Sequence, residues 1–388
     1  MTVQSLPAVC YLMPHYSEKS SQHDAHLPRL LSEIASLASL YVIVEKADRP
    51  PAIPGATDVL TQRWSKGNGL LRAIELAWLV VHVRRRGCRR FFVRIAIGAG
   101  LVVGVLGRLL GLETYFWHSG MGKEATLLHA RQQGVAPWLR ARFRYRMLRW
   151  VIHLSHHLVT GPECMAQYYM HEYGAQADKV IVLYNDIDTR MTAEMLAALS
   201  QGQARQELGL PSHRPQVLFL GRVGALKGAP YLPRLMARVA RSIPDVLFLV
   251  VGPVVLPAME GCLRDAEARS RARVLGPVPN ATALACYRAS DVFILPSDEE
   301  GFPRRLLESM AMGTPFVAFD VGGVRDIVDP RQIDFVVPPG DVEQMAERIV
   351  RLLRDPDLRA SQARIGVASV ERFATTRVAK MFVERILS

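Results

Sequence analysis

The sequence predicts an α/β protein with two doubly wound, Rossmann-like domains. Continuous apolar, β-rich runs alternate with helical patterns along the whole chain. Strands of that kind are typical of parallel sheets whose two faces are both covered by helices. A length of 388 residues is enough for two domains of ordinary size. The composition, with 49% hydrophobic and 22% charged residues, argues against global disorder.

The expected strands divide into two sets of six. Those of the first half are at 8–13, 40–45, 91–97, 114–119, 157–161 and 179–185. Those of the second half are at 216–221, 245–252, 272–278, 291–297, 314–320 and 334–340. Between the sets, a polar and helical stretch near 191–210 is expected to connect the two domains.

Positive charge is concentrated in one part of the chain. The net charge is +12, yet residues 63–149 alone hold 17 Lys and Arg against three Asp and Glu, a local excess of +14. A basic surface of this kind attracts anions in general, including nucleic acid, anionic lipid and phosphorylated substrates.

The cysteines and the first residues bear on the compartment. The five cysteines are scattered without the pair spacing of a metal site, which favours a reducing compartment and no zinc. No basic stretch followed by a long apolar segment opens the sequence, so we expect no secretion.

The segment "EEGFPRRLLE" (299–308) carries the most informative candidate residues. Pro303 suits the first position of a helix, because its fixed φ fits and its missing N–H is not needed there. This helix, expected to stop at Gly313, would point free backbone N–H groups at an anion. Glu300 precedes the helix and Glu308 lies about one and a half turns inside it, so each could accept hydroxyl groups of an elongated ligand. Hydroxylated rings on either side of a diphosphate describe a nucleotide sugar.

The loop "GRVGALKG" (221–228) supports this interpretation. Arg222 and Lys227 follow an expected strand, and two cations at its carboxyl end could neutralise a diphosphate. The alternative is structural: Glu308 would pair with a neighbouring arginine of its helix, Glu300 would be merely exposed, and the lysine would be solvated.

At this point the sequence resembles the retaining glycosyltransferases of family 4, whose GT-B fold has two Rossmann-like domains facing each other across a cleft. The resemblance rests on "GRVGALKG", on "VVGP" (250–253), on 290–323 with its E-x7-E spacing, and on the last helix. These elements cover most of residues 215–388. In the first half the match is looser and rests on the order of strands, "FWHSG" and "VLYNDID".

The resemblance implies a division of labour along the chain. The implied parts are an N-terminal acceptor-binding domain at 1–190, a linker at 191–210, a nucleotide-sugar-binding domain at 211–372 and a helix at 373–388 that crosses back to the first domain.

The resemblance also implies roles for single residues. Arg222 and Lys227 would bind the donor diphosphate. Glu300 would bind hydroxyls of the donor sugar and Glu308 those of the ribose. The implied donor-binding residues are Gly221, Arg222, Lys227, Pro277, Val278, Glu300, Gly301, Phe302, Pro303, Arg304, Arg305 and Glu308. The implied catalytic residues are His118, Glu300, Arg222 and Lys227, with His118 matching a family histidine close to the transferred sugar.

Family chemistry retains the anomeric configuration, and the leaving phosphate oxygen helps to take the acceptor's proton. Arg222, Lys227 and the helix N-terminus would stabilise the negative charge that develops on the diphosphate. The resemblance implies no catalytic metal and no cofactor.

The loop after the first strand departs from the family. Family members often carry a glycine pair there, whereas this chain reads "MPHYSEKSSQH" (13–23). We expect His15, Tyr16, Ser17 and Lys19 to shape the acceptor side instead.

Two motifs imitate other sites. "GAGLVVG" (98–104) follows a strand as a dinucleotide fingerprint would, but it lacks an acidic partner at the right distance, so we expect no NAD. Residues 95–112 form an apolar run in which Arg108 is the only charge. A membrane span is one interpretation, but five glycines and the flanking strands favour a buried crossover helix.

A third motif, Asp186-Ile187-Asp188, looks like the metal-binding D-x-D of the other large glycosyltransferase fold. It falls where family 4 enzymes commonly have Asn-Gly-Val-Asp, so we expect no metal there.

The segment 138–157 predicts a basic amphipathic helix at a membrane interface, because arginines alternate with aromatic and aliphatic residues. The alternative is an ordinary surface helix that packs its apolar side onto the sheet. The expected membrane-facing residues are Arg140, Phe143, Arg144, Arg146, Arg149 and Trp150.

The sequence therefore favours a retaining, metal-independent hexosyltransferase that moves a sugar from a UDP- or GDP-linked donor to a lipid-linked saccharide or lipid acceptor. We expect it to be cytoplasmic, on the anionic inner face of the plasma membrane, in bacterial surface polysaccharide or glycolipid synthesis. A soluble acceptor is the second hypothesis. Nucleic-acid binding through the basic segment is a third, but it would leave the carboxylate pair without a role, so we expect no nucleic acid partner.

Overall fold

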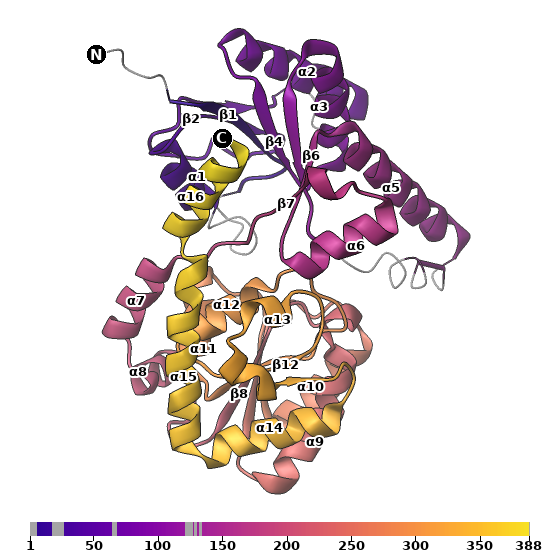
Figure 1. The fold of residues 1–388 in the computed structure, drawn as a ribbon. Coiled ribbons are helices and arrows are strands. Elements are labelled where there is room, and N and C mark those ends of the chain that lie inside the picture. Colours follow the sequence, from indigo (N-terminus) through magenta and orange to yellow (C-terminus); the bar gives the residue numbers. More distant parts are fainter. Residues whose placement is uncertain are drawn as a thin grey trace. The chain divides into compact units, whose positions relative to one another are not determined.

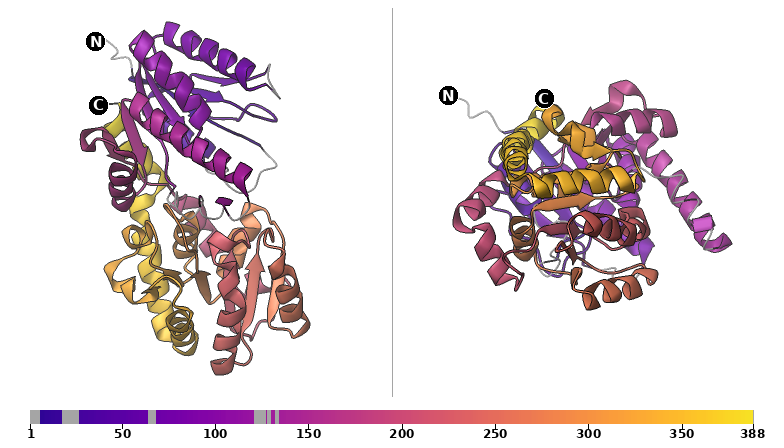
Figure 2. Two further views of the ribbon diagram at one scale, coloured as in Figure 1. Left: turned by 90° about the vertical axis from the view of Figure 1, so that its right-hand side faces the viewer. Right: turned by 90° about the horizontal axis from the view of Figure 1, so that it is seen from below.

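A computed structural model describes residues 6–17, 27–63, 68–120, 127, 130–131 and 134–387. The chain divides into two compact units, Met1–Asp186 with Thr375–Ser388, and Ile187–Ala374. Each unit contains one parallel sheet with helices packed around it (Figures 1 and 2). The predicted α/β fold with two doubly wound sheets is confirmed.

The first unit has a seven-stranded parallel sheet in the order β3-β2-β1-β4-β5-β6-β7. Its strands are β1 (Ala8–Met13), β2 (Ser39–Val44), β3 (Asp58–Thr61), β4 (Arg90–Arg94), β5 (Glu113–Trp117), β6 (His157–Thr160) and β7 (Val180–Val182). Its helices are α1 (Leu27–Ala35), α2 (Gly69–Arg85), α3 (Ile97–Leu110), α5 (Val135–Leu154), α6 (Glu163–Tyr173) and α16 (Thr375–Ile386). Sequence analysis missed the edge strand β3, whose four residues are only half-buried.

The two faces of this sheet have separate cores. Helices α1 and α16 pack on one face, where the ring of Phe382 lies 5.0 Å from that of Phe92 and 6.2 Å from that of Tyr11. Residues of α2, α3, α5 and α6 pack on the other face. The hydroxyl of Tyr115 donates to the carbonyl of Ile386 at 3.0 Å. The last helix of the chain is therefore part of the core of the first unit.

Strand β4 is shorter than predicted. It ends at Arg94 rather than at residue 97, because Ile95 adopts φ of 61° and turns the chain directly into α3. A left-handed conformation is rare for a β-branched residue and costs energy. Strain of this kind often marks a functional part of a structure.

The glycine-rich run is the buried crossover helix that its flanking strands indicated. A Cβ atom on Gly100 would lie 2.6 Å from Val151 of α5, and one on Gly107 would lie 2.6 Å from Thr114. Small residues are thus needed where α3 packs between β5 and α5. In the described parts of the chain, no helix combines the length and apolar character that crossing a bilayer requires.

The second unit has a six-stranded parallel sheet in the order β10-β9-β8-β11-β12-β13. Its strands are β8 (Gln216–Leu220), β9 (Leu247–Val251), β10 (Ala272–Leu275), β11 (Val292–Leu295), β12 (Phe316–Phe319) and β13 (Val336–Val337). Its α-helices are α7 (Thr189–Ala198), α8 (Gln201–Glu207), α9 (Leu232–Ser242), α10 (Ala258–Ala268), α11 (Asn280–Ala289), α12 (Arg304–Ala311), α13 (Val324–Ile327), α14 (Val342–Arg354) and α15 (Pro356–Val370).

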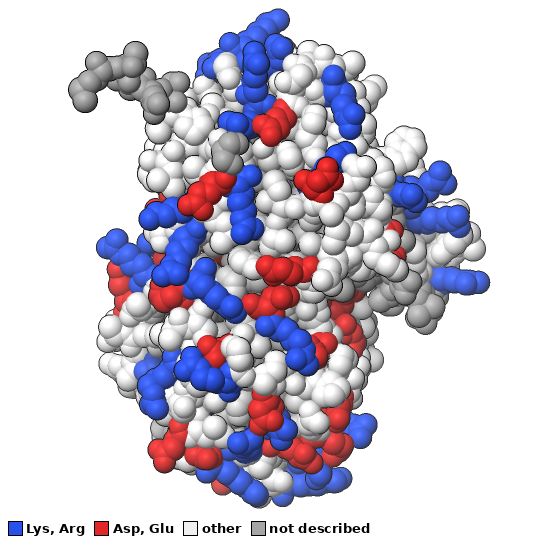
Figure 3. Space-filling view, in the orientation of Figure 1, with Lys and Arg blue, Asp and Glu red and all other residues white. Residues whose placement is uncertain are grey.

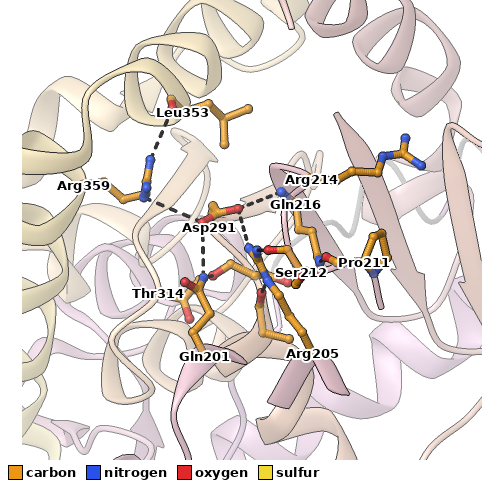
Figure 4. Close-up of polar contacts among 12 residues, drawn as sticks. Gln201, Arg205, Pro211, Ser212, Arg214, Gln216, Asp291, Thr314, Leu353 and Arg359 are labelled. Carbon is orange, nitrogen blue, oxygen red and sulfur yellow. Dashed lines mark hydrogen bonds and ion pairs between the residues drawn. The ribbon is translucent and has the colours of Figure 1, made fainter. Parts of the chain in front are cut away.

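The segment 191–210, expected to be a linker, folds instead as part of the second unit. Arg205 of α8 is buried and donates to a carboxylate oxygen of Asp291 at 2.8 Å (Figure 4). The same oxygen accepts the backbone N–H of Gln216 at 2.8 Å, and Arg359 of α15 lies 3.8 Å from the other oxygen. This buried charge network fastens α8 and α15 to the start of the sheet.

Candidate functional site

The candidate donor site lies at the carboxyl ends of β8 and β11, which are neighbours in the second sheet. The strand order reverses here, and ligands of doubly wound sheets bind at such a point. The loops after the two strands are joined, because the N–H of Asp298 donates to the carbonyl of Leu226 at 3.2 Å. Gly228 has φ of 74°, and a Cβ atom on it would lie 1.8 Å from the carbonyl oxygen of Pro296. Only glycine allows the loops to approach so closely.

Lys227 and Glu300 meet where these loops join. The ammonium group of Lys227 lies 2.6 Å from Oε1 of Glu300, and the hydroxyl of Ser297 donates to the same oxygen at 2.9 Å. Glu300 is only partly exposed, so the alternative in which it is merely a surface carboxylate is wrong. The structure brings the two predicted residues together as an ion pair.

The loop after β12 closes the other side of Glu300. The N–H of Gly323 donates to the carbonyl of Gly301 at 2.9 Å. Gly322 has φ of 50°, and a Cβ atom on it would lie 1.7 Å from the carbonyl oxygen of Glu300. Three loops from adjacent strands therefore fix the backbone around Glu300 and Gly301.

Helix α12 starts one residue later than predicted. Pro303 is its N-cap, with φ of −73° and ψ of 98°, and the helix ends at Ala311 before Gly313. Pro303 cannot be the first helical residue, because its ψ is extended. Phe302 anchors the start of the helix, since its buried ring lies 5.4 Å from that of Phe373 in an edge-to-face contact. The first backbone N–H groups of α12 directly follow the segment that contains Glu300, and the first N–H groups of a helix have no partner within it.

Glu308 is buried inside α12 and is held by two side chains. Arg305 donates to its Oε2 at 2.7 Å, and the hydroxyl of Tyr287 donates to the same oxygen at 3.3 Å. Burial alone would lower the pKa of Arg305, but the Glu308 carboxylate outweighs it and raises that pKa. The intrahelical pair of the structural alternative is thus present. A buried carboxylate with an oxygen shared by two donors is also well oriented to accept further hydrogen bonds.

Glu299 was not selected as a site residue, yet it shares this environment. Its pKa is raised to about 7, mainly by burial, with Lys227 opposing the rise and the neighbouring Glu300 adding to it. Its Oε2 atom is buried without a hydrogen-bond partner in the described structure. The sequence could have suggested Glu299 only through its position beside Glu300.

The remaining donor-binding candidates lie around this centre. Arg222 directly follows Gly221 after β8, is exposed, and forms no ion pair with another described residue. Arg304 is half-buried at the start of α12. Pro277 and Val278 follow β10, which is separated from β11 by β9 and β8 in the sheet. They are at the same carboxyl edge but farther along it.

His118 follows β5 in the first unit. Its Nδ1 atom forms a short hydrogen bond with the hydroxyl of Tyr169, which also bonds to both backbone groups of Gly120 at 3.1 and 3.2 Å. Burial lowers the pKa of His118 to about 4, and the charge of Arg144 adds to the shift. The imidazole is therefore neutral at physiological pH. Sequence analysis missed Tyr169, because nothing in its own segment links it to a residue 51 positions earlier.

The acceptor-side candidates His15, Tyr16 and Ser17 follow β1. The N–H of Tyr16 donates to the carbonyl of Lys46 at 2.8 Å, and the hydroxyl of Ser17 donates to Asp48 at 2.7 Å. These bonds fix the loop against the segment after β2 and leave His15 exposed. The fourth candidate, Lys19, lies outside the described residues.

Arg94 is a further residue that sequence analysis missed. It ends β4, is 8% exposed, and its guanidinium lies 4.2 Å from the centre of the Trp117 ring. Its hydrogen bonds are long and go to neutral groups, the Tyr11 hydroxyl at 3.3 Å and the Asn185 side chain at 3.5 Å. The only signal in the sequence was a single charge within an apolar run.

The D-x-D motif has a structural role in the described chain. Asp186 accepts a hydrogen bond from the hydroxyl of Thr375 at 2.8 Å, which ties the end of the β7 segment to the start of α16. Asp188 caps α7 by accepting the N–H of Met191 at 2.9 Å. Among the described residues, no group of three or more His, Cys, Asp and Glu side chains is placed to hold a metal ion.

Helix α5 carries the predicted membrane-facing residues on its surface. Phe143 and Trp150 are 65% and 63% exposed, and Arg140, Arg144, Arg146 and Arg149 are exposed as well. Blue side chains gather at the edge of the molecule where α5 lies (Figure 3). The buried residues of α5 are confined to its last two turns, at Leu148, Val151 and Ile152. Most of this helix therefore does not pack onto the sheet as an ordinary surface helix would.

Comparison with known proteins agrees with this geometry. Residues 200–367 match the family model described as "Glycosyl transferases group 1". A D-inositol 3-phosphate glycosyltransferase from Xylanimonas cellulosilytica is 31% identical over 242 residues, which cover 60% of this chain and 57% of that protein. The chain thus spans a little over half the length of such curated relatives.

Two solved structures resemble the whole described chain. Sucrose-phosphate synthase from Thermosynechococcus elongatus has a TM-score of 0.75 at 18% identity, over 98% of both chains. HepE from Anabaena, solved in complex with UDP and glucose, has a TM-score of 0.71 at 17% identity, over 98% of this chain and all of that one. Residues 200–367 are a group 1 glycosyl transferase domain, and the chain has the fold of the GT-B glycosyltransferases.

Proposed function

We propose that this protein is a retaining glycosyltransferase that uses a nucleotide-diphosphate sugar and needs no catalytic metal. The proposal depends on one observation, the cluster of Lys227, Glu300 and the start of α12 at the carboxyl ends of β8 and β11. A diphosphate needs cations and free N–H groups, and the two rings beside it need acceptors for their hydroxyl groups. This cluster, together with Glu308, supplies both kinds of group.

The mechanism follows from where charge develops. As the bond between the sugar and the diphosphate breaks, negative charge grows on the leaving phosphate oxygen. Arg222, Lys227 and the N-terminus of α12 would stabilise that charge. The same oxygen would take the proton of the acceptor hydroxyl on the face where the new bond forms, so the configuration is retained. Neutral His118 would bind a hydroxyl of the sugar and would not supply a charge.

The paired state of the site fits this role. Lys227 and Glu300 neutralise each other at 2.6 Å, so neither charge is left uncompensated before the donor arrives. Binding would then exchange partners: the diphosphate would take the place of Glu300 beside Lys227, and Glu300 would turn to the sugar hydroxyls. Among donors, UDP and GDP sugars remain the candidates; HepE, which shares the fold, was solved with UDP and glucose.

For the acceptor we propose a lipid-linked saccharide or a lipid, reached at an anionic membrane face. The support is the outer surface of α5, where Val135, Leu139, Phe143 and Trp150 are between 53% and 72% exposed. Their spacing of i, i+4, i+8 and i+15 places them on one side of the helix, opposite its buried residues. An apolar stripe flanked by arginines is suited to the interface of an anionic bilayer. The setting would be bacterial surface polysaccharide or glycolipid synthesis on the cytoplasmic side.

A second candidate keeps the donor site and uses a soluble phosphorylated acceptor. The observation that favours it is the name of the relatives, which are D-inositol 3-phosphate glycosyltransferases. In that case the basic surface of the first unit would serve the acceptor phosphate.

The donor site is tested by thermal stabilisation with a panel of UDP- and GDP-linked sugars, with and without EDTA. A donor at 100 times its dissociation constant stabilises the folded protein by about 2.7 kcal/mol, and Glu308→Ala should abolish the shift. Glu260→Ala, an exposed carboxylate of α10, is the matched control and should keep it. The absence of a shift with every donor would contradict the proposal. The anomeric proton of the product, followed by NMR, tests retention.

Vesicle sedimentation separates the two acceptor classes. Binding to anionic vesicles at low salt should be strong in the wild type and lost in Leu139→Asp/Phe143→Asp. The double variant Val255→Asp/Ile333→Asp changes two exposed apolar residues of the second unit and should bind as the wild type does. If the wild type does not bind at low salt, or transfers sugar to inositol phosphate at a high rate, the soluble acceptor is favoured.

A further inference from the structure

The first unit has a wide groove between α5 and α6, separate from the residues assigned to the donor. It has a volume of about 920 Å³. On α5, Trp138, Arg142, Tyr145 and Arg149 line it at the spacing i, i+4, i+7 and i+11, so they form one side of the helix. Tyr173 of α6 lies on the opposite wall. The groove is thus built by aromatic and guanidinium groups.

The groove is rich in arginine and has a single carboxylate among its described lining residues. Helix α5 has five arginines and no carboxylate over Val135–Leu154. None of its lining arginines 142, 146 and 149 forms an ion pair with a described residue. Glu172 also lines the groove, and its Oε1 lies 3.0 Å from Nδ1 of His171.

This arrangement costs stability when no anion is present. Arg142 and Arg146 are four residues apart, and Arg146 and Arg149 are three apart, so like charges face each other along the helix. The guanidinium of Arg142 lies 5.3 Å from the centre of the Trp138 ring, which orients it but does not neutralise it. A bound anion would remove the repulsion, and guanidinium groups match phosphate oxygens as two-pronged donors.

The inner wall of the groove leads to His118. Tyr173 packs against Tyr169 with ring centres 5.4 Å apart, and the hydroxyl of Tyr169 is the hydrogen-bond partner of His118. All of these residues belong to the first unit. A ligand held in the groove would therefore lie along the same wall as the histidine expected near the transferred sugar.

We propose that this groove binds the phosphate or diphosphate of a lipid-linked acceptor together with the first part of its hydrocarbon chain. Arg142, Arg146 and Arg149 hold the phosphate, and Trp138, Trp150 and Leu154 contact the chain. The inference rests on the proposed function and adds to it a defined site for one acceptor molecule. The site shares Trp150 with the outward apolar stripe, whose other residues, Val135, Leu139 and Phe143, would contact the bilayer as a surface.

The test uses farnesyl diphosphate in solution, without vesicles, and follows tryptophan fluorescence, because Trp138 and Trp150 line the groove. We expect saturable binding, and at least tenfold weaker binding in Arg142→Gln/Arg146→Gln/Arg149→Gln. The matched control is Arg241→Gln/Arg264→Gln/Arg269→Gln, which removes the same charge from exposed positions of the second unit and should bind as the wild type. Should the triple variant not fold, Arg142→Gln and Arg149→Gln alone should each weaken binding at least threefold.

Three results would overturn the proposal. Equal binding by the wild type and the groove variants would show that the three arginines do not bind the phosphate. Equal binding of farnesol would show that no phosphate is recognised, and equal binding of inorganic diphosphate would show that no lipid chain is recognised. Donor stabilisation is measured on the same samples. If it persists while farnesyl diphosphate fails to bind, the groove is wrong and the glycosyltransferase proposal stands.

Discussion

The cluster around Glu300 in the second unit and helix α5 in the first unit hold their cations in opposite ways. In that cluster two cations have carboxylate partners at short range, Lys227 with Glu300 at 2.6 Å and Arg305 with Glu308 at 2.7 Å, whereas Arg222 forms no ion pair with a described residue. In the first unit the arginines of α5 that line the groove form no ion pair with any described residue. The two proposals made above therefore use two kinds of anion binding. Paired cations exchange an internal partner for a ligand, whereas unpaired cations wait for one.

This difference has an energetic consequence. Removing one partner of a buried ion pair lowers the stability of its unit, because the other charge is left uncompensated. An exposed cation among like charges lowers the stability of the helix that carries it, because the charges repel one another. Removing a cation should therefore lower the free energy of unfolding where the cation has a buried carboxylate partner, and raise it on α5.

The largest effect is expected for Asp291→Ala in the second unit. The change leaves Arg205 and the backbone N–H of Gln216 buried without their acceptor, and breaking a buried pair costs roughly 3–5 kcal/mol. Urea unfolding measures the loss, with the exposed Asp265→Ala as control. A loss below about 1 kcal/mol would mean that this network does not hold α8 and α15 in place.

The next effect is expected on activity. Lys227→Ala removes the cation closest to the expected leaving group, and removing one such group lowers the rate roughly 10²–10³-fold. The variant should fold normally, and Lys227→Arg should recover part of the rate. Lys380→Ala on the exposed side of α16 is the control. Unchanged kcat and kcat/KM in Lys227→Ala would leave the Lys227–Glu300 pair with a structural role only.

The same contrast explains what the sequence could predict. The sheets followed from apolar runs separated by helices, since that periodicity is local. The meeting of Lys227 and Glu300 in one cluster agrees with the positions of "GRVGALKG" and "EEGFPRRLLE", because short motifs placed after neighbouring strands meet at the carboxyl edge of the sheet. The predictions that were wrong concern features that depend on contacts between residues far apart in the sequence. The segment 191–210 joined the second unit through the partnership of Arg205 and Asp291, which are 86 residues apart.

The site residues that escaped prediction share this cause. Each of them is a candidate because of one contact: Tyr169 with His118, Tyr287 with Glu308, and Arg94 with Trp117. In each pair the two residues lie on different elements. The predicted end of β4 was wrong for a local reason. Ile95 adopts a left-handed backbone conformation, which isoleucine rarely does. The Lys227–Glu300 pair itself was not foreseen, although both residues were chosen, because motifs show position but not pairing.

A smaller effect is expected for the dependence of stability on pH. The pKa of His118 is about 4 in the folded protein against an ordinary value of 6.5. Between these values the unfolded chain binds a proton that the folded protein does not, so stability falls as the pH decreases from 7 to 4.5. The His118→Gln variant lacks this group and should lose about 2 kcal/mol less over that interval.

Urea unfolding at both pH values measures the difference. Arg144→Gln should reduce the pH dependence in part, because the charge of Arg144 is one cause of the lowered pKa. Parallel pH dependence in the wild type and His118→Gln would contradict a neutral, buried imidazole. A clear effect of Arg144 would show that an arginine of α5 acts on the site through space although it has no carboxylate partner there.

The smallest expected effect is on the stability of Arg146→Gln, and it tests the contrast between paired and unpaired cations directly. Arg146→Gln removes repulsion with Arg142 and Arg149, so the protein should become more stable by about 0.5 kcal/mol at low salt, and by less at 0.5 M NaCl, which screens the charges. Arg269→Gln at the C-cap of α10, four residues after Asp265, removes a favourable spacing of opposite charges and should lower stability by about 0.3 kcal/mol. Urea unfolding of the two variants therefore separates them by sign. A loss of stability in Arg146→Gln would mean that α5 has an internal partner for its charge, and the contrast between the two units would no longer hold.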